Sequence, residues 1–123
     1  LIGNARPFPL MVDRRHFNPA KRMVDEIASG DLDAGVLWGP IGGFYAKKAR
    51  VPITVRSLAH ENSRPRMTYR ITFGVRPTEK EWKRQLNRLI RKKQTAINKI
   101  LLDFGVPILD EDDNLITAAG TGN

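Results

Sequence analysis

The residues whose side chains could do chemistry are few and scattered. The two histidines, His16 and His60, fall in predicted loops, and neither has a carboxylate or a second histidine at metal-ligand spacing. The run from Asp110 to Asn114 resembles the start of a calcium-binding loop. It lacks the glycine at the sixth position and the glutamate at the twelfth that such a loop requires. We therefore interpret the histidines as surface residues and the acidic run as a tail.

The sequence has no candidate nucleophile. It contains no cysteine, no serine in a nucleophile elbow and no Gly-Lys-Ser/Thr phosphate loop. The glycines between Gly39 and Gly43 match neither the dinucleotide-binding nor the phosphate-loop spacing. We therefore predict a protein that is not an enzyme and that holds neither a metal ion nor a cofactor.

A glycine-rich stretch, Ala34–Phe44, is the best candidate for a binding site. Its first part is an uncharged apolar run that predicts a strand buried on both faces, and Pro40 suits the first position of a following helix. Ligands of open α/β sheets bind just beyond the carboxyl ends of the strands. The glycines are explained equally well by tight strand–helix packing. The candidates for a ligand cleft or an interaction site are Trp38, Gly39, Pro40, Ile41, Gly42 and Phe44.

Cations gather on a predicted C-terminal helix. The net charge of +8 either serves solubility or indicates an acidic partner, whether protein, nucleic acid or anionic lipid. The exposed face of the helix has no interleaved aromatic residues and no helix-turn-helix spacing, which argues against nucleic acid. A solvated face or a docking surface for an acidic protein fits better. The candidate docking face comprises Lys83, Arg84, Arg88 and Arg91.

The elements that must position these residues alternate in type. One helix is predicted between an Asn18-Pro19 start and Gly30, and a short one begins at Pro40. Strands are predicted at Pro7–Val12, Ala34–Leu37, Val51–Val55 and Met67–Val75. This alternation is typical of a parallel sheet in an α/β protein. No apolar run approaches the ~20 residues of a membrane-spanning helix, so no membrane insertion is expected.

An apolar stripe from Trp82 to Phe104 predicts a helical C-terminal region. Thr78 and Glu81 have the spacing of a capping box at its start, and Gly105 marks its end. The stripe lapses at Lys93, so the sequence fits one long helix or two helices that meet near residues 91–95.

Two segments carry a resemblance to a known family. Ile27–Lys48, and later Thr72–Arg76 with Leu86-Asn87, resemble the C-terminal half of type II periplasmic solute-binding proteins of family 3. The sequence of Leu37–Gly43, together with that of Phe104–Pro107, is similar to one subgroup, the methanol-dehydrogenase-associated J proteins (MxaJ/XoxJ-like). In the wider family an aspartate after the central strand holds the ligand's ammonium. Gly39 occupies that position here, so the resemblance does not predict an amino-acid ligand.

The resemblance implies an α/β protein with a partial type II periplasmic-binding-protein fold, the C-terminal half of a two-lobe molecule. Residues 1–59 would be the remainder of the second lobe, residues 60–65 the hinge connection, and residues 66–123 the strand and helices that return to the first lobe, ending in a frayed tail. Because neither lobe would be complete, we expect an oligomer or association with a missing N-terminal part.

The resemblance also implies a function. It predicts a periplasmic, non-enzymatic accessory protein that contacts a pyrroloquinoline-quinone (PQQ) methanol dehydrogenase, its cytochrome c, or both. The alternative is an ABC-transporter solute-binding protein for a small ligand other than an amino acid. A basic nucleic-acid-binding domain is a third and weaker hypothesis.

Overall fold

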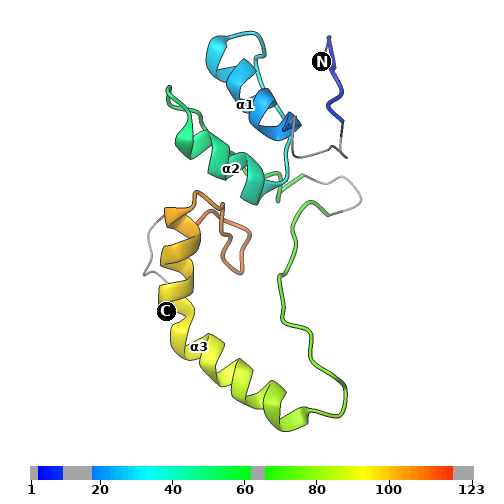
Figure 1. The fold of residues 1–123 in the computed structure, drawn as a ribbon, viewed down its shortest axis with the longest axis vertical. Helices are drawn as coiled ribbons and strands as arrows, with labels where there is room; N and C mark the ends of the chain where they lie inside the picture. Colours follow the sequence, from blue (N-terminus) through cyan, green and yellow to red (C-terminus); the bar gives the residue numbers. More distant parts are fainter. Residues whose placement is uncertain (1–2, 10–17, 62–65, 118–123) are drawn as a thin grey trace. The chain divides into compact units, whose positions relative to one another are not determined.

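The computed structural model describes residues 3–9, 18–61 and 66–117, and these residues form three helices (Figure 1). The chain divides into two compact units. Unit 1 comprises Leu1–Val55 together with Phe104–Val106, and unit 2 comprises Arg56–Asp103 together with Pro107–Asn123. Unit 1 contains α1 (Pro19–Ser29) and α2 (Gly39–Lys48), and unit 2 contains α3 (Lys80–Asp103).

Helix α1 begins and ends at the residues that the sequence predicts. The Asn18 side chain accepts a hydrogen bond from the Lys21 backbone N–H at 3.0 Å, and Pro19 takes the first turn. Gly30 closes the helix in the left-handed conformation. Met23 and Val24 are the buried hydrophobic side chains among the described residues, and α1 packs against α2. They form the small core of unit 1.

Gly105, a second glycine in the left-handed conformation, brings Phe104–Val106 into contact with α2 within unit 1. Gly105 has a φ of 80°, and a Cβ atom there would lie 2.6 Å from the Gly43 carbonyl oxygen. Beside it, the Phe104 ring stacks on Phe44 with the ring centroids 6.2 Å apart. The sequence predicts Gly105 as a helix terminator, and the structure adds that its missing side chain lets residues 104–106 approach α2.

Helix α3 is one continuous helix, which decides between the two alternatives that the sequence left open at residues 91–95. Its start differs from the prediction, because the Glu81 carboxylate pairs with Arg84 rather than completing a capping box with Thr78. Arg76 pairs with Glu79 just ahead of the first turn. No described residue of α3 is buried.

The predicted α/β fold is wrong. In the described part of the chain, β pairing amounts to one isolated antiparallel bridge, between Leu109 and Leu115, and the residues form a small all-α fragment. The partial type II periplasmic-binding-protein architecture is therefore not present in this structure. Residues 10–12 of the first predicted strand lie outside the described residues.

The physical reason is the lack of pairing partners. Residues 34–37, 51–55 and 67–75 have no regular structure, and no ladder joins them to another described segment. A strand is stable only when a neighbour accepts and donates its backbone hydrogen bonds. The predicted strand Ala34–Leu37 is also not buried, since Val36 is 73% exposed. In the predicted strand Met67–Val75, whose odd-numbered residues are apolar, Ile71 is 83% exposed.

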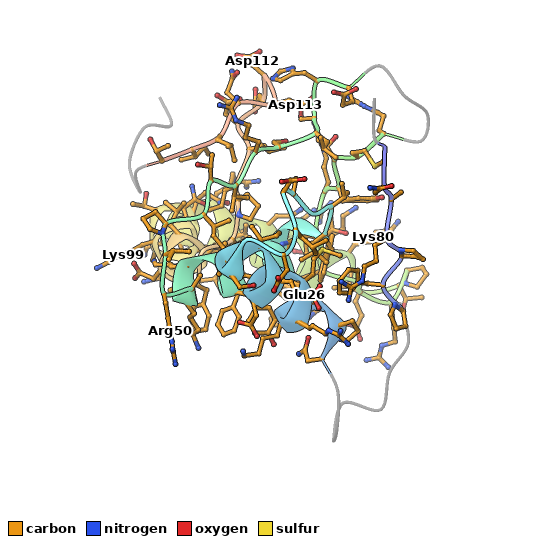
Figure 2. The ribbon with its side chains drawn as sticks, turned by 90° about the horizontal axis from the view of Figure 1, so that it is seen from above. Glu26, Arg50, Lys80, Lys99, Asp112 and Asp113 are labelled. Carbon is orange, nitrogen blue, oxygen red and sulfur yellow. The ribbon has the colours of Figure 1, made fainter. Side chains whose placement is uncertain are left out.

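An ion-pair cluster ties α1 to the segment that precedes it. Glu26 of α1, labelled in Figure 2, accepts a hydrogen bond from Arg22 Nε at 2.7 Å and another from Arg6 Nη2 at 3.0 Å. The Arg6 guanidinium also lies 5.0 Å from the centre of the Phe8 ring. The hydrogen bond from Arg22 is the main cause of a lowered pKa of the Glu26 carboxyl, and Arg6 adds to it against the opposing effect of desolvation.

This cluster predicts a dependence of stability on pH. Because folding lowers the pKa of Glu26 from its ordinary 4.5, its contribution is present above that value and is lost as the pH falls through the folded-state pKa. We expect the wild type to lose more stability between neutral pH and pH ~3 than Glu26→Gln, which cannot ionise. Thermal melts across that range test this. Asp110, whose pKa is also lowered, titrates in both proteins and so cancels from the comparison. Parallel pH profiles would contradict the prediction.

Candidate functional site

The first set of predicted site residues lies at the start of α2. Trp38 is the N-cap, without a side-chain capping bond, and its carbonyl oxygen accepts from the N–H groups of Ile41 and Gly42 at 3.0 and 2.9 Å. The helix begins at Gly39, with Pro40 in the first turn as predicted. The Trp38 side chain is 56% exposed and that of Ile41 is 39% exposed. These two side chains are therefore available for contact with another molecule.

Phe44 and Gly42, also predicted as cleft candidates, serve internal packing in unit 1. Phe44 stacks on Phe104, meets Tyr45 edge-on with centroids 5.3 Å apart, and has the Lys48 ammonium 4.1 Å from its centroid. A Cβ atom at Gly42 would lie 3.2 Å from Leu37 Cβ. The sequence allowed a ligand site or close packing as the reason for the glycines. At Gly42 the short distance to Leu37 supports close packing.

The start of α2 offers no acid–base or metal chemistry. The helix has no acidic residue in its first turn, and Gly39 brings no carboxylate. Across the described ranges, no group of three or more histidine, cysteine, aspartate or glutamate side chains is placed to hold a metal ion. His16 lies outside the described residues, and His60 is exposed.

The acidic run after α3 is a folded turn, so its interpretation as a tail is wrong. Asp110 Oδ1 accepts from the backbone N–H groups of Asp112 and Asn114 at 2.9 and 2.8 Å. The bridge between Leu109 and Leu115 closes the turn. These bonds, that of Asn114 first, lower the pKa of the Asp110 carboxyl. The carboxylate that could have been a calcium ligand instead stabilises its own turn.

The second set of predicted site residues forms a basic face on α3 in unit 2. Lys83, Arg84, Arg88 and Arg91 all lie on its first half and are exposed. Arg84 pairs with Glu81. Lys83, Arg88 and Arg91 have no carboxylate partner among the described residues. Unpaired exposed cations on one helix create a local positive potential that attracts an acidic partner.

The structure also reveals a groove that the sequence analysis missed. An open groove lies between residues 73–77 and the first two turns of α3, lined by Phe73, Arg76, Lys80, Lys83 and Arg84 among others. The signal that could have indicated it is the Arg76–Glu79 spacing around Pro77, which folds the segment back at the helix start. The groove extends the basic face with an aromatic side chain. The two sets of site residues lie in different units, and each stands as a separate candidate.

The described residues thus form helical units with an apolar candidate site at the start of α2 and a basic one on α3, and they contain no catalytic constellation. The chain is 29% identical over 93 residues to protein MoxJ of Methylorubrum extorquens, and 24% identical over 95 residues to protein MoxJ of Paracoccus denitrificans. These matches cover 72% and 73% of this chain but 31% and 34% of the relatives, so the chain spans about a third of their length. The resemblance to the J proteins is confirmed as a distant and partial similarity.

Two other comparisons give no match. No family model matches the chain. No solved structure matches it either. Of the helices that the structure describes, none combines the length and the hydrophobicity needed to cross a membrane.

Proposed function

We propose that the chain is a non-enzymatic accessory protein of periplasmic methanol oxidation, acting through protein–protein contacts on a quinoprotein methanol dehydrogenase or its cytochrome c. The observation that carries this proposal is the similarity to protein MoxJ, which extends over 72% of the chain. The exposed, unpaired cations of α3 supply a means of contact, since a basic surface accelerates encounters with an acidic protein.

The contact is assigned to the basic face of α3 in unit 2. Arginines suit this role because the guanidinium binds carboxylates in a fork of two hydrogen bonds. No carboxylate of the described residues pairs with Arg88 or Arg91, so the partner's carboxylates would meet no competitor from that part of the chain.

Reversing charge on the basic face should slow partner association. For the triple variant Lys83→Glu, Arg84→Glu, Arg88→Glu, we expect association with the dehydrogenase or its cytochrome to slow by about tenfold or more at low salt. The difference from wild type should shrink as added salt screens the charges. Surface plasmon resonance across a range of ionic strength measures both effects.

A matched control carries the same change in net charge elsewhere. Arg50, Arg56 and Arg70 are exposed and lie outside α3, and replacing all three with glutamate should leave association much faster than in the α3 variant. Equal slowing in the two triple variants would mean that only net charge matters. Unchanged association in both would mean that the basic face is merely solvated, and either result would overturn the assignment.

A further inference from the structure

Helix α3 exposes an apolar stripe that nothing in the described chain buries. At about 100° per residue, six apolar side chains fall on one side of the helix. We call these the α3 stripe: Trp82, Leu86, Leu89, Ile90, Ile97 and Ile100. Trp82 is 49% exposed, Leu89 is 53% exposed and Ile100 is 57% exposed. Burying apolar side chains away from water is favourable, so a contiguous exposed stripe of this kind indicates a surface that contacts another apolar phase.

The lysines and arginines of α3 are distributed around the helix, and two of the lysines flank the stripe. On the same helical geometry Lys83 borders the stripe along one edge, Lys92 lies beyond the other edge, and Lys93 falls within the stripe. Lys80 and Lys99 lie on the side opposite the stripe. The arginines, Arg84, Arg88 and Arg91, project from the opposite side. Figure 2 shows Lys99 reaching outward from its helix. None of these lysines has a carboxylate partner among the described residues.

This arrangement fits an anionic lipid surface better than a second copy of the chain. Helix α3 contains eight lysines and arginines but two acidic residues. Two such helices placed stripe to stripe would therefore repel each other. Lysine tolerates the boundary of an apolar phase, because its four-carbon stem lies along the apolar surface while the ammonium stays in water. The surface of an anionic bilayer supplies acyl chains for the stripe and headgroup phosphates for the bordering lysines.

We propose that α3 is an interfacial helix that lies flat on anionic phospholipid. Its stripe enters the boundary between headgroups and acyl chains, and Lys83 and Lys92 bind the phosphates beside it. Lys93 keeps the centre of the helix shallow, because its ammonium must reach back to the headgroups. The helix lies on the bilayer and does not cross it. Arg84, Arg88 and Arg91 face away from the lipid, so Lys83 is the one residue of the basic face that this proposal shares with the proposed contact with a dehydrogenase.

Vesicle binding tests the proposal directly on the full chain. The probes are phosphatidylcholine vesicles with and without phosphatidylglycerol, and a Trp38→Phe background leaves Trp82 as the one tryptophan. We expect co-sedimentation with the anionic vesicles, weak binding to the neutral ones, and a blue shift of Trp82 emission upon binding. Because no dehydrogenase is present, the result is independent of the proposed function.

Two double variants with the same net charge separate the faces. Leu89→Glu with Ile100→Glu should weaken binding to the anionic vesicles by about tenfold or more, because two large apolar side chains are lost from the stripe. Arg88→Gln with Arg91→Gln should weaken it by less than about threefold, because those charges point away from the lipid. All four residues are exposed, so circular dichroism should show unchanged helix content in both variants.

Three outcomes would overturn the proposal. One is equal weakening in the two double variants, which would make binding a matter of net charge alone. Another is equal binding to neutral and anionic vesicles. The third is the absence of vesicle binding together with a dimer, seen by sedimentation, that Leu89→Glu with Ile100→Glu dissociates. That result would assign the stripe to a second copy of the chain.

Discussion

Val24→Asp should unfold the α1–α2 packing of unit 1. Val24 is 4% exposed, and together with Met23 it forms the buried hydrophobic core of the described residues. An unpaired carboxylate at this position costs about 3–5 kcal/mol, which is comparable with the whole stability of a small unit. Hydrogen exchange of the α1 amides measures the loss, because it reports on unit 1 alone.

The same substitution at an exposed valine is the control. Val36 lies in unit 1 and is 73% exposed, so Val36→Asp adds an identical charge without burying it. We expect its α1 amides to keep their protection. Equal loss of protection in the two variants, or none in Val24→Asp, would show that α1 and α2 are not held together by this core.

Gly105→Ala should destabilise unit 1 by about 2–4 kcal/mol. Two penalties add at this position. The φ of 80° is strained for any residue with a Cβ atom, and that atom would lie 2.6 Å from the Gly43 carbonyl oxygen. A backbone oxygen cannot swing aside as the end of a long side chain can. Relieving the clash would move Phe104 off the Phe44 ring.

Gly74→Ala provides the matched control for this change. A Cβ atom at Gly74 would meet nothing within 4 Å, and its φ is not in the left-handed region. Denaturant unfolding should therefore show Gly74→Ala within about 0.5 kcal/mol of wild type or slightly more stable. If the two alanine variants have the same stability, the approach of residues 104–106 to α2 contributes nothing to unit 1.

The helices could be predicted from sequence because their signals are local. Asn18, Pro19 and Gly30 delimit α1 through bonds and conformations within a few residues, and Pro40 similarly marks the start of α2. The strand predictions failed, because a strand depends on a neighbour that its own residues do not encode. The alternation from Met67 to Val75 describes how a strand would divide its side chains, yet it does not provide a partner.

For the candidate site residues too, what depends on local sequence could be predicted, and what depends on distant partners could not. The basic residues of α3 lie on one helix as predicted, since helical spacing alone decides which residues share a side. The role of Phe44 could not be predicted, because its stacking partner Phe104 is sixty residues away along the chain. The groove at residues 73–77 likewise depends on how the segment before α3 folds back.

The order of the chain through its two units has a consequence for synthesis. Unit 1 is discontinuous, since Phe104–Val106 completes it after nearly all of unit 2 has been made. During synthesis α1 and α2 therefore emerge from the ribosome well before Phe104, which stacks on Phe44. The backbone hydrogen bonds of α3, in contrast, join residues that are close in sequence. Closing a loop of this length adds an entropic cost that short-range contacts do not carry. Assembly of unit 1 should consequently be a late event, and until then the Phe44 ring lacks its stacking partner Phe104 and can contact other molecules.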